Sequence, residues 1–555
     1  MNRKKKSLQS IHLGEYKEKV HRRLEYWEKK SYLQNLWAKN HSLWSSRPVS
    51  EIENRLGWLN LPEKMPGCVE DFLSFAHEVK SEGITHVVLL GMGGSSLAPE
   101  VFQKTFGNAP GYPQVMVLDS THPQAVETVE GQIDLNQTLF LVSSKSGTTM
   151  ETLSLFRYFW NRMSLIHSKP GRFFAAVSDQ GSPLVETAQK RGFRKIFNPP
   201  SDVGGRYSAF TDFGLVPAAL IGMNISKLLY RGQLGSKNNA VWGNEKNSSA
   251  LFLGAALGEL APTRDKLTFL SSPTLHPFPQ WLEQLIAEST GKKGKGIIPV
   301  VDEPLLPVDQ YGQDRVFVGL TLEGDPNREL QDFLEKIEKS GHPLIRIHLK
   351  DKYELGEEIF RWETAVASAG SILGIHPFNQ PDVKLAKDLT RKTMEEKKGR
   401  GVSKEEIDIS QPQPLKAELK EWISSLSTGD YLSIQAYLSP DPETTQALQR
   451  IRGDLLNKTR LATTLGYGPR FLHSTGQLHK GGSNKVQVLQ VIDTPSKDFP
   501  VPETDYSLRE LIQAQSEGDF KALQQRKRRV LRVNLNQQVL EGLQKLRDLI
   551  KELNA

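Results

Sequence analysis

Apolar strands that each end in a polar loop and lead into a helix recur along most of this chain. The first segment, THVVLLGMGGSSLAPEVFQKTF (85–106), has an apolar run, a Gly/Ser loop and a helical stretch, and TLFLVSSKSGTTMETLSLFRYFW (138–160) repeats that order. Strands that alternate with helices form parallel βαβ units, and continuously apolar strands are typical of sheets covered on both faces. The pattern predicts an α/β fold built from doubly wound parallel sheets.

Changes in composition divide the 555 residues into four predicted parts. A Gly/Asn-rich stretch near 231–248 marks a junction, and the charged stretch 391–414 has the character of a linker. Later strands are predicted at 266–272, 315–322 and 343–349, and in the segments YLSIQAYL, VQVLQVI and VLRVNL, with a helix near 516–529. We expect a helical N-terminal segment at 1–80, α/β domains at 81–235 and 245–395, and a C-terminal α/β extension at 415–555.

The composition excludes several classes of protein. With 71 Lys and Arg against 64 Asp and Glu, the net charge is 71 − 64 = +7, which suits an anionic small substrate without requiring nucleic acid. The single cysteine, Cys68, allows neither an intrachain disulfide nor a cysteine-based zinc cluster. The basic N-terminus lacks an apolar core for a secretory signal, and no apolar run is long enough to span a membrane. We therefore expect a cytoplasmic protein.

Two loops have the composition of a phosphate site. GMGGSS (91–96) and SSKSGTT (143–149) each follow a predicted strand and open a helix. Backbone N–H groups at a helix N-terminus, together with Ser and Thr hydroxyls and a lysine, bind phosphate well. A helix cap needs only one hydroxyl, and the surplus favours a phosphate cradle over simple capping. Neither a P-loop motif nor a dinucleotide-binding fingerprint is present.

Further along the chain, candidate catalytic and substrate-binding side chains occur singly or in pairs. Arg206 follows two glycines in GGRYS, where a structural ion pair is the alternative. Gln284 and Glu288 are four residues apart and share one helix face. Glu288 lies near the end of that helix, and it can be read either as a general base or as a solvated surface residue. Gln380 and Lys387 lie nearly two helical turns apart, and a surface lysine is again the alternative.

The segment YGPRFLHSTGQLHKGG (467–482) contains two histidines, His473 and His479, in a Gly-rich context. Their spacing does not match the usual zinc-binding pattern. Histidine is the natural proton shuttle near neutral pH, but a loop histidine without a role fits the sequence equally well.

Taken in order, GMGGSSLAPE, SKSGTTMET, GGRYS, Gln284 with ESTGK, and FNQPDVKLAK resemble the glucose-6-phosphate isomerases. The matched motifs cover about 85–395, and the flanks resemble the isomerase half of bacterial transaldolase/glucose-6-phosphate isomerase fusions, without the transaldolase barrel. The resemblance implies two sugar-isomerase (SIS) domains, each a doubly wound sheet. It also implies interconversion of glucose 6-phosphate and fructose 6-phosphate in glycolysis and gluconeogenesis, with no metal or organic cofactor.

The resemblance also assigns roles to residues. It implies that Glu288 moves the proton between C1 and C2, that Arg206 lies beside the reacting carbons, and that Lys387 assists ring opening. Its substrate-binding residues fall on Gly94, Ser95, Ser144, Lys145, Ser146, Thr149, Gly205, Gln284 and Gln380.

The chain departs from the family at two motifs and at the ring-opening histidine. SKSGTT replaces SKTFTT, and FNQPDVKLAK replaces FDQWGVELGK. The family's histidine has no clear counterpart between Glu288 and Lys387, where His342 and His376 are the nearest by position. His473 or His479 is favoured instead. In the family this histidine crosses a dimer interface, so the resemblance implies a homodimer.

Two other functions remain as alternatives to this reading. The same phosphate cradle serves isomerases of other sugar phosphates, and SIS domains also occur in non-catalytic sugar-phosphate sensors. A sensor is expected to lack Glu288 and Lys387 or to carry a helix-turn-helix motif, which is not found in the sequence. The basic run QQRKRRVLR (524–532) is interpreted as a solvated helix face, and neither nucleic acid nor membrane is expected as a partner.

Overall fold

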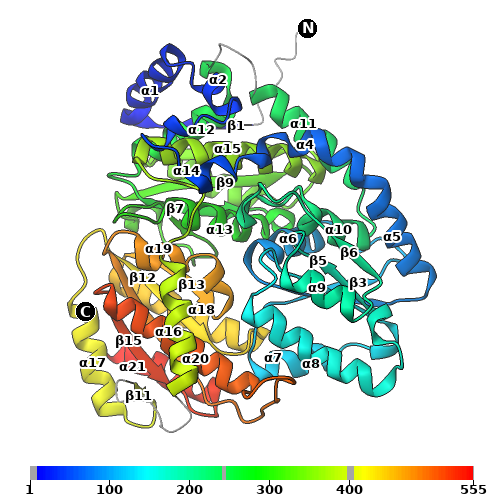
Figure 1. Ribbon diagram of the computed structural model, residues 1–555. Helices are drawn as coiled ribbons and strands as arrows, with labels where there is room; N and C mark the ends of the chain where they lie inside the picture. The colour runs from blue at the N-terminus through cyan, green and yellow to red at the C-terminus, as the bar shows by residue number, and fades with distance from the viewer. Residues whose placement is uncertain (1–8, 240–244, 397–405, 554–555) are drawn as a thin grey trace.

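The computed structural model describes three stretches of the chain, residues 9–239, 245–396 and 406–553. The basic residues 1–8 and parts of the predicted junction and linker, 240–244 and 397–405, lie outside the described residues. The described chain forms three five-stranded sheets with helices packed on them (Figure 1). The α/β fold predicted from the sequence is confirmed.

The first sheet is entirely parallel and has the strand order β3-β2-β4-β5-β6. Its strands are β2 (His86–Gly91), β3 (Gln114–Leu118), β4 (Thr138–Ser143), β5 (Phe174–Val177) and β6 (Lys195–Phe197). The accompanying helices are α6 (Leu97–Phe106), α7 (Pro123–Gly131), α8 (Met150–Ile166), α9 (Pro183–Lys190), α10 (Asp212–Leu220) and α11 (Ile225–Asn239).

The second sheet has the order β1-β10-β9-β7-β8. Its parallel strands are β7 (Lys266–Ser271), β8 (Ile298–Val300), β9 (Arg315–Leu322) and β10 (Leu344–Leu349). Its helices are α12 (Ser249–Leu260), α13 (Phe278–Thr290), α14 (Arg328–Lys339) and α15 (Leu355–Leu373). The next helix, α16 (Val383–Glu396), packs on the C-terminal part of the chain instead. Nearly all of α15 is buried, because α11, α12 and α13 pack against it.

The N-terminal segment is helical except at its start. Its helices are α1 (Lys17–Lys29), α2 (Tyr32–Trp37), α3 (Ser50–Glu53), α4 (Leu61–Lys64) and α5 (Val69–Ser81). The expectation of an all-helical segment is wrong at β1 (Gln9–His12), which pairs antiparallel with β10. The strand covers the free edge of the second sheet, where backbone N–H and C=O groups would otherwise lack partners.

The third sheet belongs to the C-terminal unit, the described residues 406–553, and is again entirely parallel. Its strands are β11 (Ile407–Asp408), β12 (Tyr431–Tyr437), β13 (Ala462–Tyr467), β14 (Val486–Ile492) and β15 (Arg529–Asn534), in the order β11-β15-β14-β12-β13. Its helices are α17 (Pro412–Ser424), α18 (Pro442–Thr459), α19 (Gly476–Gly481), α20 (Leu508–Gln525) and α21 (Val539–Glu552).

The three sheets share one strand order. If the four core strands of each sheet are numbered along the chain from β2, β7 and β12, every sheet reads 2-1-3-4 across its width. This order is that of a doubly wound sheet, whose chain reverses direction between the first and third strands. The strand order of the first two sheets is therefore repeated in the C-terminal unit.

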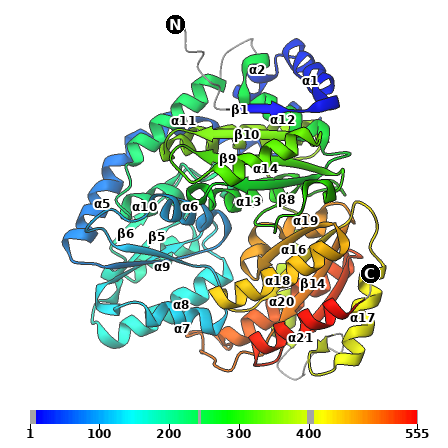
Figure 2. The same ribbon diagram turned by 180° about the vertical axis from the view of Figure 1, so that it is seen from behind.

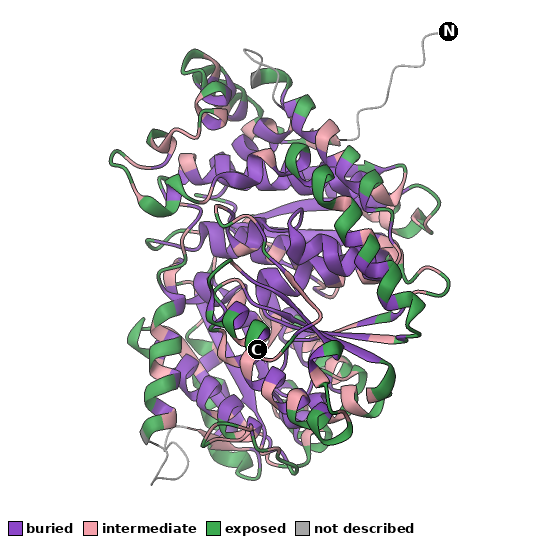
Figure 3. Ribbon diagram, turned by 45° about the vertical axis from the view of Figure 1, so that its right-hand side comes forward, coloured by how far each residue is buried: buried purple, intermediate pink, exposed green. Residues whose placement is uncertain are grey.

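The C-terminal unit packs against the other two sheets instead of standing apart (Figures 1 and 2). One apolar cluster joins Ala287, Ile298 and Val300 of the second sheet's region to Tyr431 and Leu478 of the C-terminal unit. The central strands and the inward helix faces are mostly buried, while outward helix faces are largely exposed (Figure 3). The predicted limits of the domains stay a prediction.

Two C-terminal expectations differ from the structure. The helix expected near 516–529 begins earlier, because Ser507 and Glu510 form a reciprocal capping box at its start. The basic run 524–532 is not a solvated helix face, since it spans the end of α20 and part of β15. Arg528 donates to three backbone carbonyl groups and Arg532 is buried beside Glu517. Among the described helices, none combines the length and apolar character needed to cross a bilayer.

Candidate active site

The two predicted phosphate loops lie side by side at the carboxyl edge of the first sheet. Strands β2 and β4 are neighbours, and Gly91 pairs in register with Ser143, so both loops begin at the same level. This gap between the first and third strands is the switch point where doubly wound sheets bind ligands. Gly94 packs so closely on Gly205 that a Cβ atom on it would lie 2.0 Å from the Gly205 carbonyl oxygen.

Hydroxyl groups cluster at the start of α8. The Ser144 and Thr149 hydroxyl oxygens are 2.9 Å apart, as are those of Ser146 and Thr148. Thr149 occupies the N-cap position of α8, yet its side chain makes no capping bond to the helix. These hydroxyls are therefore not consumed by helix capping, as the sequence analysis expected of a phosphate cradle.

The other two residues predicted for the cradle have different surroundings. Ser95 is buried in the turn that precedes α6. The Lys145 ammonium donates to both carboxylate oxygens of Asp179, at 2.8 and 2.9 Å. Burial lowers the pKa of Lys145, although its bond to Asp179 opposes that shift. Lys145 is thus placed beside the cradle with its charge already paired.

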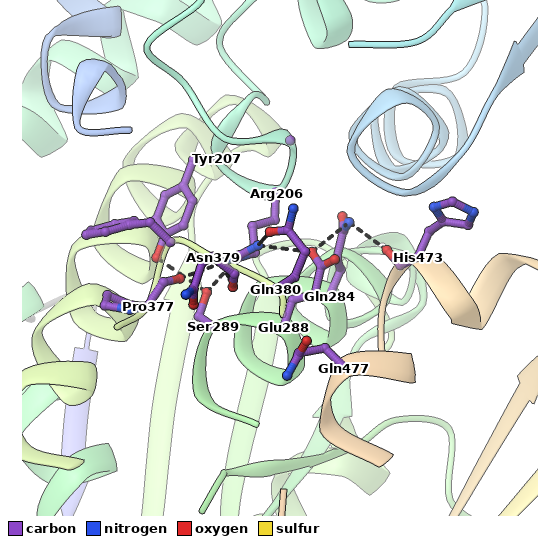
Figure 4. A network of polar contacts seen from close by, with 12 residues as sticks. Arg206, Tyr207, Gln284, Glu288, Ser289, Pro377, Asn379, Gln380, His473 and Gln477 are labelled. Carbon is purple, nitrogen blue, oxygen red and sulfur yellow. Dashed lines mark hydrogen bonds and ion pairs between the residues drawn. The ribbon is translucent and has the colours of Figure 1, made fainter. Parts of the chain in front are cut away.

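Arg206 is the centre of a buried polar network (Figure 4). Its guanidinium donates to Ser289 Oγ at 2.8 Å, to Glu288 Oε2 at 3.3 Å and to Gln380 Oε1 at 3.1 Å. It also donates to the carbonyl oxygens of Pro377 (2.5 Å) and Asn379 (3.1 Å). The planar guanidinium has five N–H donors, so this network fixes both its position and its plane.

Glu288 lies where all three sheets meet. The Gln284 amide, one helical turn earlier on α13, donates to Glu288 Oε2 at 3.3 Å and to the His473 carbonyl oxygen at 2.8 Å. A Cβ atom on Gly93, whose φ is +56°, would lie 2.8 Å from that same carbonyl oxygen. A loop of the first sheet and a loop of the C-terminal unit therefore both lie close to Glu288, the predicted base, which belongs to the second sheet's region.

His473 forms a pair with a carboxylate that the sequence analysis missed. Its Nε2 lies 2.9 Å from Glu151 Oε1, and since a carboxylate only accepts, Nε2 donates. Gln515 donates to the same oxygen at 2.8 Å and accepts from Thr121 at 2.9 Å. Burial opposes ionisation of Glu151, but the charges of His473 and Lys387 help to lower its pKa to about 2.

Lys387 belongs to α16, and its charge is one of the causes that lower the pKa of Glu151. Lys387 itself is exposed on α16. A second lysine missed from the sequence, Lys292, is buried and donates to the His376 carbonyl oxygen at 2.6 Å. Burial and the charge of Arg206 lower the pKa of Lys292 well below its usual value.

The structure separates the four candidate histidines. His479 is buried in the C-terminal unit, where its ring nitrogens face Gln435 Nε2 (3.0 Å) and Ser433 Oγ (3.4 Å). His342 is buried against Phe317 of the second sheet. His376 accepts from the Phe378 backbone N–H at 3.1 Å, close to the Arg206 network. Of these, His473 is the one that contacts both Glu151 and the Gln284 that bonds Glu288.

Nothing in the local sequence distinguishes Glu151 from other helix-start residues. An acidic residue in the first turn of a helix is favoured by the helix dipole alone, and Glu151 occupies that position in α8. Its partner His473 is more than 300 positions away. Within the described residues, no three His, Cys, Asp or Glu side chains group as a metal site would require.

Comparison with known proteins shows which family this chain is similar to. The Phosphoglucose isomerase family model matches residues 62–299. The chain is 30% identical over 395 residues to glucose-6-phosphate isomerase of Mycoplasmopsis pulmonis, covering 62% of this chain and 90% of the relative. The chain belongs to the glucose-6-phosphate isomerase family. It is therefore an isomerase, and the family resemblance of its motifs is confirmed.

Other relatives agree with this assignment. The glucose-6-phosphate isomerase of Methanocaldococcus jannaschii is 26% identical over 391 residues, covering 62% of this chain and 94% of that protein. The crystal structure of a glucose-6-phosphate isomerase from Chlamydia trachomatis matches in fold with a TM-score of 0.57 at 17% identity, covering 71% of this chain and 89% of that one. Gln380, Lys387 and His473 lie outside the residues matched by the family model.

Proposed function

We propose that this isomerase interconverts glucose 6-phosphate and fructose 6-phosphate through a cis-enediol, with Glu288 as the base. The proposal is carried by the position of Glu288, which faces Arg206 and Gln284 at the point where the three sheets meet. A carboxylate held there by two donors is fixed in place, and fixed geometry is what lets a general base act in a bound complex.

The phosphate group binds at the carboxyl edge of the first sheet. The hydroxyls of Ser144, Ser146 and Thr149 and the N–H groups at the start of α8 are the proposed ligands, with Ser95 from the neighbouring loop. Lys145, paired with Asp179, adds a positive charge beside these hydroxyls. Binding energy from this remote group positions the reacting carbons beside Glu288.

Proton transfer between C1 and C2 is the task of Glu288. In the aldose-to-ketose direction its carboxylate takes the C2 proton and returns it to C1. Negative charge that develops on the enediolate oxygen is offset by the guanidinium of Arg206, which the surrounding carbonyl oxygens and Ser289 hold in position. Gln284 and Gln380 are proposed to bind substrate hydroxyls, with Gly94 and Gly205 lining the sugar.

Ring opening is assigned to His473 and Lys387. With Nε2 of His473 donating to Glu151, the proton exchanged with the sugar is carried at Nδ1. The histidine and the lysine move a proton between the ring oxygen of the sugar and its anomeric hydroxyl group. His479 is left out of this step because its contacts belong to the interior of the C-terminal unit. The homodimer and the cytoplasmic location stay predictions.

Proton NMR of fructose 6-phosphate with purified protein in D2O and EDTA tests the proposal. We expect glucose 6-phosphate carrying deuterium at C2, and a loss of turnover of about 10²–10⁴-fold in Glu288→Gln. The exposed Glu329→Gln on α14 is the matched control and should behave as wild type. Wild-type turnover in Glu288→Gln would remove Glu288 from the mechanism. Bound fructose 6-phosphate with neither exchange nor product would indicate a sensor.

A further inference from the structure

We propose that a single chain completes this active site, with the C-terminal unit supplying His473 from within the same chain instead of a partner subunit. The inference rests on the proposed function, because it concerns the ring-opening group of that reaction. The first observation is geometric. His473 bonds Glu151 of the first sheet's region and Gln284 of the second's, and all three residues belong to one chain.

Polar side-chain contacts hold the C-terminal unit against the first sheet's region. Arg470, three residues before His473, donates to Glu100 and lies 3.1 Å from Asp119. His122 lies 3.1 Å from Asp493, and both side chains are almost fully buried. Separation of the unit would leave these polar groups without their partners, so the contacts favour the docked arrangement.

A second set of contacts fixes the unit to the second sheet. Glu303 accepts from the Thr463 backbone N–H at 2.7 Å while it pairs with the buried Arg315. Arg452 donates to the Asp302 carbonyl oxygen at 2.8 Å. These bonds and the shared apolar cluster fix the C-terminal unit to the second sheet's region. The loop that carries His473 is therefore held by contacts with both the first and the second sheet's regions.

The helix that carries Lys387 also rests on the C-terminal unit. Helix α16 packs along α20, so closely that a Cβ atom on Gly518 would lie 2.5 Å from the Thr390 hydroxyl oxygen. At the start of α16, Asp382 accepts from Gln477 at 2.8 Å and pairs with Arg526. Both proposed ring-opening groups, His473 and Lys387, are therefore positioned by the C-terminal unit.

The position of the loop argues against a histidine from a second chain. The His473 carbonyl oxygen lies against Gly93 and accepts from Gln284, one turn from Glu288. The Glu151 oxygen that a histidine would bind is already shared by His473 and Gln515. A partner's side chain would have to displace this loop and break the ion pairs beside it.

Complementation between two inactive variants tests the proposal. Glu288→Gln and His473→Asn are expressed together with different tags, and any hetero-oligomer is isolated through both tags. If each site lies within one chain, every site carries one substitution and no activity returns. If sites are shared across a two-fold dimer, one of the two sites of each heterodimer is free of both substitutions, and about half of wild-type activity returns in the isolated heterodimer.

The outcomes separate this inference from the proposed function. No restored activity, or an active monomer when wild-type enzyme is diluted and sized by mass photometry, supports the inference. Restored activity overturns it, as does full activity of His473→Asn alone, which would leave the isomerase assignment intact. An inactive wild-type enzyme would instead contradict the proposed function. If His473→Asn fails to fold, His473→Gln replaces it in the same pairing.

Discussion

Glu151→Gln is expected to slow ring opening without removing the fold of the site. The substitution keeps the shape of the side chain but replaces the carboxylate that accepts from His473 at 2.9 Å and Gln515 at 2.8 Å. With a pKa of about 2, this carboxylate is charged throughout the neutral range. A hydrogen bond to a charged group contributes about 1.5–3 kcal/mol. At about 1.4 kcal/mol per tenfold, kcat/KM should fall by about 10- to 150-fold.

The assay must distinguish ring opening from proton transfer at carbon. Opening and reclosing the ring interconverts α- and β-glucose 6-phosphate, and magnetisation-transfer NMR measures that rate separately from isomerisation. We expect Glu151→Gln to slow both rates, whereas Glu288→Gln should stop isomerisation and leave anomer exchange largely intact. This contrast depends on Glu151 acting through His473.

A matched control is available in the same sheet. Glu186 is also in the first turn of a helix, α9, but it is exposed, so Glu186→Gln removes a comparable helix-start charge away from the site. Its kinetics should equal those of wild type. The reasoning is refuted if Glu151→Gln leaves anomer exchange unchanged, even when isomerisation falls, because the carboxylate would then not act on ring opening.

Three further predictions concern separate parts of the molecule. Lys387→Met should reduce the rate of anomer exchange, measured by NMR, about 10²-fold or more through loss of an acid–base group. Lys384→Met, which removes another exposed lysine of the same helix, should leave that rate unchanged. Thr149→Ala should raise KM for fructose 6-phosphate about tenfold or more through a lost bond to phosphate, with little change in Tm because its hydroxyl makes no capping bond; an unchanged KM would exclude it from the cradle. Burial, aided by neighbouring cations, lowers the pKa of His479 to about 3, so acidification below 6.5 favours the unfolded state. His479→Gln should remove up to about 1.4 kcal/mol per pH unit of that acid sensitivity in urea unfolding.

Much of the fold follows from local patterns in the sequence. Long apolar strands such as β2 and β4 are readable because both faces are covered. The strands that escaped notice are short or mixed: β8 and β6 have three residues each, and β13 (ATTLGY) has little apolar character. The strand β1 was missed because its stability comes from pairing with β10, which is far away in the sequence.

The candidate site divides in a similar way. Motifs on one loop or helix, such as Ser144 with Thr149 or Gln284 with Glu288, can be read from spacing because backbone geometry fixes their relation. The pairing of His473 with Glu151 depends on how the C-terminal unit docks, which spacing does not encode. His479 has the same local context as His473, and only the packing of α19 against the third sheet distinguishes the two.

The repeated strand order explains how the C-terminal unit can contribute to the site. The three units contribute different parts of the proposed site. The first gives hydroxyls at the start of α8, the second gives Glu288 in the last turn of α13, and the third gives His473 in the turn after β13. Here a third sheet of the same order, held by contacts of Arg470 and Asp493 with the first sheet's region, brings the loop of His473 to the site within one chain. The relation between Glu288 and His473 is then fixed by folding itself, which is why subunit mixing is the experiment that most directly tests how this site is assembled.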